Sequence, residues 1–377
     1  MQDTFDKYLP WFILREIPHV GNALIKRLVD HLGSARRVLT ASSKELTAID
    51  RVGERTARQI LAHKKVLDVA KKELERTLSS GANIIALSDQ KYPLLLRAIP
   101  DPPPVLTYFG EPDNQAPSIS IVGSRQSTRY GENTARKLAF DLSSSGFQIV
   151  SGMARGIDTM AHKGALEAGK KTIAVMGSGL NKIYPKENLP LFKQIRSTGT
   201  VYSEFKVDTH PAPANFPVRN RIIAGLSCGT IVVEAARKSG SLITARLAAE
   251  YNREVFSIPG SIFSAKSQGA HALLKQGAKL VENQTDVIEE LGHFVHCQDA
   301  KRPATAVPQS RQHLSSDHCT THQIMDYLDP YPVHIDTLIQ KSGMDSASVA
   351  SQLLDLELTG KINRHKGNYY SISEDYH

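Results

Sequence analysis

Five short apolar runs recur between residues 81 and 296, and they constrain the fold more than any other feature of the chain. They cover residues 118–122, 147–150, 172–176, 230–233 and 254–258. Segments of helical periodicity separate them, and the segment after the first run places four apolar residues on one face: Ala135, Leu138, Ala139 and Leu142. Apolar strands that alternate with helices are typical of a mostly parallel sheet covered on both faces. The sequence therefore predicts a doubly wound α/β domain over residues 81–296.

Residues 1–80 are helical in pattern and basic, with 15 Lys and Arg against 10 Asp and Glu. Two segments within them, residues 17–21 and 49–53, precede apolar residues at helical spacing, and each resembles the turn of a helix-hairpin-helix. In that module a glycine turn lets backbone amides approach a nucleic-acid phosphate. His19 and Arg51 stand here in place of the earlier turn glycine. Two roles therefore stay open for these hairpins, a purely structural one and DNA contact.

The C-terminal part of the chain predicts a linker followed by a small domain. Residues 297–314 carry prolines and polar residues without a period, which is typical of a linker. In residues 315–377 we expect three short helices and a β-wing, and the run 360–369 resembles the end of a winged-helix domain. Such domains commonly contact DNA but also serve in protein contacts. Because Asp355 and Glu357 make the expected recognition helix acidic, we do not expect that helix to read DNA.

The cysteines are odd in number and far apart, at Cys228, Cys297 and Cys319. This spacing argues against a disulfide framework and favours a reducing compartment. No apolar run is long enough for a signal peptide or a membrane span, so we expect a cytoplasmic protein. Histidines and cysteines gather between residues 293 and 322, but no Cys-x-x-Cys pair anchors them. We therefore expect no metal site.

Glycine-containing turns follow four of the expected strands. They lie at residues 123–125, 151–156, 177–179 and 259–261. The carboxyl ends of the strands in an open α/β sheet share one crevice, where glycine lets the backbone approach an anion and helix N-termini offer free N–H groups. Because Arg125 and Arg155 lie in two of these turns, we expect an anionic ligand. The alternative is that glycine is needed there only for tight turns.

A second cluster, from Phe216 to Arg221, combines an aromatic ring with two arginines. Arg219 and Arg221 flank Asn220; guanidinium groups bind phosphate oxygens in bidentate fashion, while an aromatic face stacks on any base. The formal net charge of +8 also favours a polyanionic partner. The cluster predicts a single-stranded nucleic acid as the ligand. The alternative is that the arginines pair with acids such as Glu204 and that Phe216 belongs to the core.

Signatures of nucleotide chemistry are absent from the sequence. It contains no Gly-x-x-x-x-Gly-Lys-Ser/Thr loop, and no Gly-x-Gly-x-x-Gly follows the first expected strand, so neither ATP hydrolysis nor a dinucleotide cofactor is supported. The serines near the strand ends lack an evident base: Ser151, Ser203, Ser239 and Ser241. We expect no catalytic residue, no cofactor and a role that is not enzymatic.

Several ordered motifs resemble the DNA-processing protein A family, known as DprA or Smf. They lie at residues 121–125, 151–158, 174–180, 216–227, 239–245 and 255–260. The resemblance covers nearly the whole chain and implies a Rossmann-like DNA-binding domain, an N-terminal helical domain of sterile-alpha-motif type and a C-terminal winged helix. It also implies a protein that binds and protects single-stranded DNA and loads RecA onto it during natural transformation and homologous recombination. The partners implied are RecA, single-strand-binding protein and a second copy of the chain, which would pair through the Rossmann-like domain.

The same resemblance implies which residues form the DNA-binding pocket. They are Gly123, Ser124, Arg125, Gly152, Arg155, Gly156, Phe216, Arg219, Asn220 and Arg221, with Lys163, Ser239, Gly240 and Ser241 as rim members. Two other classes of function stay open. Residues 225–234 distantly resemble the signature of lysine-decarboxylase-like phosphoribohydrolases, which cleave nucleotides, but the leading Pro-Gly-Gly is missing. A pure protein-interaction adaptor is the third class.

Overall fold

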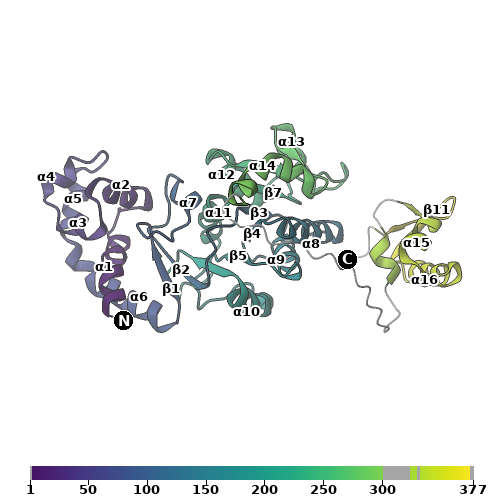
Figure 1. Cartoon of the computed structure of the whole chain (residues 1–377), viewed down its shortest axis with the longest axis horizontal. Helices are drawn as coiled ribbons and strands as arrows, with labels where there is room; N and C mark the ends of the chain where they lie inside the picture. Colours follow the sequence, from purple (N-terminus) through teal and green to yellow (C-terminus); the bar gives the residue numbers. More distant parts are fainter. Residues whose placement is uncertain (1, 300–322, 329–331, 374–377) are drawn as a thin grey trace. The chain divides into compact units, whose positions relative to one another are not determined.

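The computed structural model describes residues 2–299, 323–328 and 332–373, and the chain divides into two compact units, Met1–Arg302 and Pro303–His377. The first unit contains the N-terminal helices and a large sheet, and the second is a small domain of helices and a β-wing (Figure 1). In the described ranges, no helix has both the length and the apolar character that crossing a membrane requires.

The first eighty residues form short helices joined by tight turns. The helices are α1 (Gln2–Glu16), α2 (Asn22–Leu32), α3 (Ala35–Thr40), α4 (Ser43–Thr47), α5 (Glu54–Leu61), the 3-10 helix η1 (His63–Val66) and α6 (Leu67–Ser79). In the two predicted hairpin turns, His19 has a φ of 63° and Arg51 a φ of 66°, values that favour glycine. Gly21 and Gly53 then cap α2 and α5 with nearly the same backbone angles, φ −84° and −82°. The hairpin geometry is therefore retained although His and Arg replace the earlier glycine.

One twisted sheet forms the centre of the first unit. Its strands are β1 (Asn83–Ala86), β2 (Val105–Gly110), β3 (Ser118–Val122), β4 (Gln148–Ser151), β5 (Thr172–Val175), β6 (Thr200–Ser203), β7 (Gly229–Val232), β8 (Glu254–Ser257) and β9 (Lys279–Leu280). The order is β1-β2-β6-β5-β4-β3-β7-β8-β9; β1 pairs antiparallel with β2, β2 antiparallel with β6, and the remaining neighbours are parallel. The five predicted strands are confirmed to within one residue at each end. The sequence analysis missed the other four; β9 is only two residues long, and β6 is polar at both ends.

Helices cover both faces of the sheet, as predicted (Figure 1). They are α7 (Leu94–Arg97), α8 (Arg129–Ser144), α9 (Ile157–Glu167), the 3-10 helix η2 (Lys186–Asn188), α10 (Leu189–Thr198), α11 (Asn215–Leu226), α12 (Ser241–Glu250), α13 (Gln268–Lys275) and α14 (Gln284–Asp299). The predicted apolar face of α8 is confirmed and packs with α9 and α14 over Ile119 and Ile121. On the opposite face α11, α12 and the N-terminal helices share one core with Val150 and Ile173. Helices before residue 80 and the sheet after it thus pack as one body.

The strand order reverses at β3. From β3 the chain passes through α8 to β4 on one side, whereas β7 pairs with the other side of β3. In open α/β sheets, ligands bind beyond the carboxyl ends of the strands at such a switch point. The fold therefore directs attention to the loops after β3, β4, β5 and β7.

The second unit has the winged-helix architecture that the sequence predicts. Its elements are the 3-10 helix η3 (Gln323–Tyr327), β10 (Val333–His334), α15 (Ile335–Ser342), α16 (Ser346–Leu358), β11 (Ile362–His365) and β12 (Tyr369–Ile372). Helix α16 contains neither Lys nor Arg. Helix α14 extends three residues into the predicted linker, whose remainder, residues 300–314, lies outside the described residues. The His and Cys cluster between residues 293 and 322 likewise lies outside the side chains that the structure describes.

Candidate functional site

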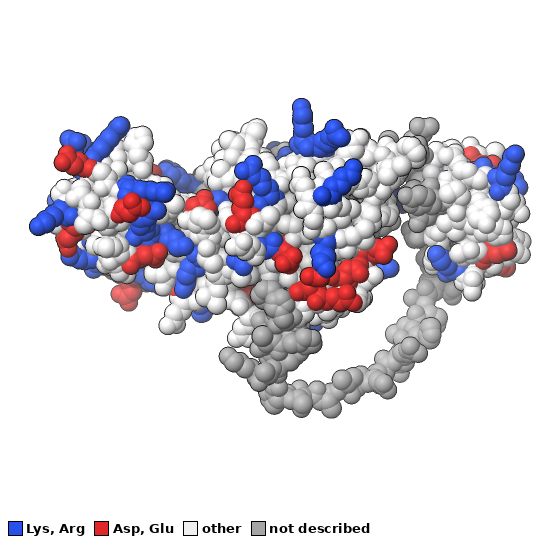
Figure 2. Space-filling model, turned by 90° about the horizontal axis from the view of Figure 1, so that it is seen from above, with Lys and Arg blue, Asp and Glu red and all other residues white. Residues whose placement is uncertain are grey.

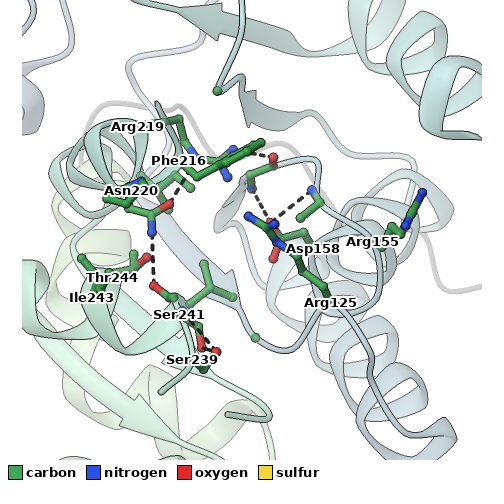
Figure 3. A pocket seen from close by; sticks show the side chains of 18 of the residues that line it. Arg125, Arg155, Asp158, Phe216, Arg219, Asn220, Ser239, Ser241, Ile243 and Thr244 are labelled. Atoms are coloured by element: carbon green, nitrogen blue, oxygen red, sulfur yellow. Dashed lines mark hydrogen bonds between the residues drawn. The ribbon is translucent and has the colours of Figure 1, made fainter. Parts of the chain in front are cut away.

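A pocket with a volume of about 870 Å³ opens where the strand order reverses. Its walls come from the loops after β3, β4, β5 and β7 and from helices α11 and α12 (Figure 3). The predicted site residues that line it are Gly123, Ser124, Arg125, Gly152, Arg155, Phe216, Arg219, Asn220, Ser239, Gly240 and Ser241. The predicted residues Gly156, Lys163 and Arg221 do not line it.

Surface charge alone does not locate this site. On the face shown in Figure 2, Lys and Arg side chains are spread over the first unit and interrupted by acidic side chains, rather than gathered in one stripe. The argument for a ligand therefore depends on the geometry inside the pocket.

Helix α11 supplies one wall through residues at helical spacing. Phe216, Arg219, Asn220 and Ile223 all line the pocket, and they follow the i, i+3, i+4, i+7 pattern of one helix face. Arg221 lies two residues beyond Arg219, about 200° around the helix, and so faces the other way. This periodicity is the signal that could have separated the two arginines from sequence alone.

Arg219 lies at the floor of the pocket and is only 3% exposed. Its Nη1 donates hydrogen bonds to the carbonyl oxygens of Gly152 and Val175, at the ends of β4 and β5, and its Nε donates to Asn220 Oδ1 at 3.2 Å. Burial lowers the pKa of Arg219 to about 10. A Cβ at Gly152 would lie 2.5 Å from the guanidinium, so this glycine makes room for Arg219. Arg219 thus holds two strand ends against α11.

Asp158, which the sequence analysis missed, holds the same turn from the other side. It lies in the first turn of α9 and is buried; its Oδ2 accepts hydrogen bonds from the backbone nitrogens of Gly152 at 3.1 Å and Ala154 at 3.3 Å. Burial raises the pKa of Asp158, and the positive charge of Arg219 opposes that shift. The backbone of the turn after β4 is therefore held by two buried charged side chains, Asp158 and Arg219, and only the tertiary structure reveals this arrangement.

An arginine–aromatic stack forms the centre of the pocket wall (Figure 3). The Arg125 guanidinium carbon lies 4.6 Å from the centroid of the Phe216 ring, and Tyr184 packs on Phe216 with 5.9 Å between ring centroids. Arg125 makes no hydrogen bond or ion pair with any residue that the structure describes. A Cβ at Gly177 would lie 2.8 Å from the Phe216 ring, so any side chain at this position of the turn after β5 would collide with the ring. The hydrogen-bond donors of Arg125 are thus free to meet a ligand beside an aromatic face.

The rim carries two further cations, of which one is paired within the described residues. Arg155 is exposed and pairs with Glu187, and in Figure 3 it points away from the other labelled side chains. Lys238 lines the pocket, is exposed and has no partner among the described residues. The sequence analysis missed Lys238, although its place directly before the predicted Ser239–Ser241 turn was a usable signal.

The turn before α12 closes the remaining side. Asn220 Nδ2 donates to the Gly240 carbonyl at 3.2 Å, and the hydroxyls of Ser239 and Ser241 bond to each other at 2.8 Å. Helix α12 begins here without a side-chain cap, so its positive dipole end contributes to the pocket. Asn220 is therefore already committed to the protein. The backbone N–H groups of Ser241, Leu242 and Ile243 also bond within the turn, so this side contributes the helix dipole rather than free donors.

Arg221 follows the alternative considered from the sequence. It is an ion-pair partner of Glu204, and its Nε lies 3.5 Å from Asp101 Oδ2, on the side of α11 turned toward the N-terminal helices. Gly156 has a φ of 70°, which favours glycine, and a Cβ there would overlap the Ser124 carbonyl. Lys163 lies on the exposed face of α9. Gly156 therefore has a steric role, which is the alternative considered for the strand-end turns.

Comparisons with known proteins point to one family in all three parts of the chain. A family model described as DNA recombination-mediator protein A matches residues 83–292, a DprA winged helix domain model matches residues 306–368, and a helix-hairpin-helix motif model matches residues 12–68. Protein Smf of Synechocystis is 33% identical over 96% of this chain and 97% of its own length. The X-ray structure of DNA processing protein A from Streptococcus pneumoniae aligns with a TM-score of 0.65 at 35% identity, over 76% of this chain and 97% of that one. A structure described by the single-stranded DNA binding mode of DNA processing protein A from Helicobacter pylori aligns with a TM-score of 0.51 at 31% identity, over 56% of this chain and 96% of that one.

Proposed function

The chain belongs to the DNA recombination-mediator protein A family, and from this premise we propose that its pocket binds single-stranded DNA. The observation that carries the proposal is the Arg125–Phe216 stack, with a guanidinium that has no acceptor among the described residues. A cation beside an aromatic face suits a phosphate next to an unstacked base, and every base has a face that can stack. The relative from Helicobacter pylori, whose structure concerns single-stranded DNA binding, supports the same ligand.

We propose that the pocket contacts the DNA backbone without reading sequence. Two of the pocket's polar side chains that suit base edges are engaged within the protein: Asp158 accepts two backbone N–H bonds, and Asn220 bonds to Arg219 and Gly240. Two pocket cations, Arg125 and Lys238, have no acceptor among the described residues, and both suit phosphate oxygens. Binding should therefore tolerate any base composition.

We also propose that the protein performs no chemistry of its own. In the described pocket Ser239 and Ser241 bond to each other, and neither has a histidine or carboxylate as a hydrogen-bond partner. From the family resemblance we propose that the protein protects single-stranded DNA and loads RecA onto it, including strands covered by single-strand-binding protein. A homodimer through the Rossmann-like domain is supported by edge strand β9, where Leu280 is 47% exposed, and by Phe263 after β8, which is 92% exposed.

A binding titration tests the DNA proposal. Labelled single-stranded and duplex oligonucleotides of equal length are titrated at several salt concentrations with the wild type and with Arg125→Gln. We expect the single strand to bind more tightly, and Arg125→Gln to lower the magnitude of the slope of log K against log salt by about 0.7, the value for one phosphate contact on a single strand.

Arg196→Gln is the matched control, because Arg196 also stacks on a phenylalanine, Phe109, at 3.9 Å, but lies outside the pocket lining. Equal slopes for the three proteins would remove Arg125 from the site, and equal affinity for duplex would overturn single-strand binding. The mediator role predicts faster RecA assembly on covered strands with no ATP consumed by this protein. Release of free base from nucleoside monophosphates would instead favour the phosphoribohydrolase alternative.

A further inference from the structure

The segment after β6 connects the N-terminal helices to the pocket. Residues 204–207 are held by three bonds to those helices: Arg15 Nη2 to the Glu204 carbonyl at 2.9 Å, Lys206 Nζ to Glu16 at 2.6 Å and Val207 N to Glu73 Oε1 at 2.8 Å. A few residues further on, Pro211, Ala212 and Pro213 line the pocket. The chain that forms one pocket wall is therefore fixed by helices α1 and α6 directly before it enters that wall.

The side chain of Glu204 makes a second connection. It pairs with Arg221 of α11, and Asn22 Nδ2 of α2 donates to its Oε2 at 3.5 Å. Both side chains of the ion pair are buried, with 10% of Glu204 and 7% of Arg221 exposed, and Glu204 Oε1 is buried with no hydrogen-bond partner in the part of the chain that the structure describes. Burial raises the pKa of Glu204, while Arg221 and Arg15 oppose the shift. A buried pair that leaves an oxygen unpartnered adds little to stability, so its use is better sought in the geometry that it fixes.

That geometry concerns helix α11. Arg221 faces the N-terminal helices, whereas Phe216 and Arg219 on the same helix face the pocket. A shift or rotation of α11 that broke the Glu204–Arg221 pair would move Phe216 relative to Arg125 and pull Arg219 from the strand ends. One pocket wall contains residues 211–213 and another contains α11. Both are thus connected to the N-terminal helices through Glu204 and the segment that it begins.

We propose that Glu204 is a positioning residue through which the N-terminal helices set the shape of the single-stranded DNA pocket. The inference rests on the proposed DNA-binding function and extends it to helices that do not line the pocket. It follows that docking of the N-terminal helices and binding of DNA are thermodynamically coupled. Contacts that hold α11 in place increase the affinity for DNA, and bound DNA stabilises the docked helices by the same free energy.

The first test compares full-length wild type with Glu204→Gln in the oligonucleotide titration. We expect Glu204→Gln to bind about 5- to 150-fold more weakly, the usual range of coupling between sites, with an unchanged salt slope because no phosphate contact is lost. Arg221→Gln alone should give at least the same loss, since it also removes the contacts with Asp101, and Glu204→Gln should add little to it in the double variant because the pair is already broken. If Glu204→Gln unfolds, Lys206→Met on the more exposed side of the same segment should show a smaller loss in the same direction.

The second test uses Trp11, the single tryptophan of the chain, which is buried in α1 one turn before Arg15. Acrylamide quenching of Trp11 should fall when oligothymidylate saturates the wild type and should not change in saturated Glu204→Gln. Ile60→Val is the matched control for stability, because Ile60 is buried in α5 and its apolar side chain cannot hydrogen-bond to Glu204; it should bind DNA like the wild type.

Three results would each overturn the positioning role. Folded Glu204→Gln could bind DNA with wild-type affinity, DNA could leave the Trp11 quenching of the wild type unchanged, or Ile60→Val could lose as much affinity as Glu204→Gln. Failure of the wild type to bind single-stranded DNA would instead overturn the proposed function on which it rests.

Discussion

The floor and the rim of the pocket use arginine in opposite ways. Arg219 on the floor and Arg125 on the rim both lie against Phe216, with guanidinium carbons 5.8 and 4.6 Å from the ring centroid. Arg219 is 3% exposed and bonds to two backbone carbonyls, whereas Arg125 has no protein acceptor among the described residues. The floor arginine fixes the backbone, and the rim arginine is left to meet a ligand.

This contrast separates two kinds of evidence for a binding site. Arginines beside an aromatic residue indicate an anionic ligand only when their hydrogen-bond donors are unused. In this pocket the number of internal acceptors distinguishes a structural arginine from one that is free for a ligand. Substitutions on the floor should therefore act mainly on stability, and those on the rim mainly on DNA binding.

The largest effect is expected on the floor. Arg219→Gln leaves the Gly152 and Val175 carbonyls without their donor, at a cost of about 1–3 kcal/mol for each buried group. Urea unfolding should show a clear loss of stability, and DNA binding should fall with it. Arg219→Lys, which keeps the charge but not the planar fork, should lie in between. If Arg219→Gln has the stability of the wild type, Arg219 does not fix the strand ends, and the difference claimed between Arg219 and Arg125 is wrong.

Phe216, which both arginines contact, should contribute through stacking. Phe216→Ala should weaken single-stranded DNA binding by about 1–3 kcal/mol with little change in salt slope, because a base stack is lost and no phosphate contact is. Fluorescence anisotropy across salt concentrations measures both quantities. If thermal melting shows that the variant is mainly destabilised and its folded fraction binds DNA normally, Phe216 has a structural role like that of Arg219 and does not stack on a base.

A buried histidine on α9 gives the floor a pH dependence. His162 is fully buried, its Nδ1 lies 2.8 Å from Thr172 Oγ1, and its Nε2 has no hydrogen-bond partner among the residues that the structure describes. Burial lowers the pKa of His162 to about 3, and Arg219 adds to the shift. The unfolded chain takes up this proton below about pH 6.5, whereas the folded chain does not, so stability falls as pH falls from 6.5 toward 3.

Between pH 7 and pH 5 this loss should be about 2 kcal/mol, from 1.36 kcal/mol per pH unit. Urea unfolding at the two pH values should show a smaller loss for His162→Asn than for the wild type. An equal loss in both proteins would assign the acid sensitivity to other groups.

The smallest effect is expected at the outer rim. Glu187 pairs with Arg155, and this exposed acid competes with a phosphate for the same guanidinium. Glu187→Gln should raise single-stranded DNA affinity by roughly two- to fivefold and leave the melting temperature unchanged, because exposed pairs are weak. A salt titration should also show a steeper slope if Arg155 gains a phosphate. No gain in affinity would place Arg155 outside the DNA path.

Local patterns in the sequence determined the framework of the protein. The five apolar runs gave the strands next to the switch point, and the four apolar residues of α8 gave its buried face. Segments 17–21 and 49–53 located both hairpin turns, and His19 and Arg51 adopt the left-handed backbone there although neither is glycine. The strand-end turns and the aromatic–arginine cluster also contain many of the residues that line the pocket. These features follow from short-range periodicity and steric demands, which a sequence displays directly.

The tertiary structure alone decided what each side chain in those motifs does. Arg219 and Arg221 look equivalent in the sequence, yet α11 turns one to the strand ends and the other to Glu204. Gly152 and Gly177 look like anion-binding turns, yet each makes room for a side chain of α11. Asp158 and Lys238 lie in or beside the sequence motifs, yet only the structure shows that both line the pocket. The physical reason is that burial and hydrogen-bond partners are set by segments far apart in the chain, and those partners decide whether a charge is used by the protein or left for a ligand.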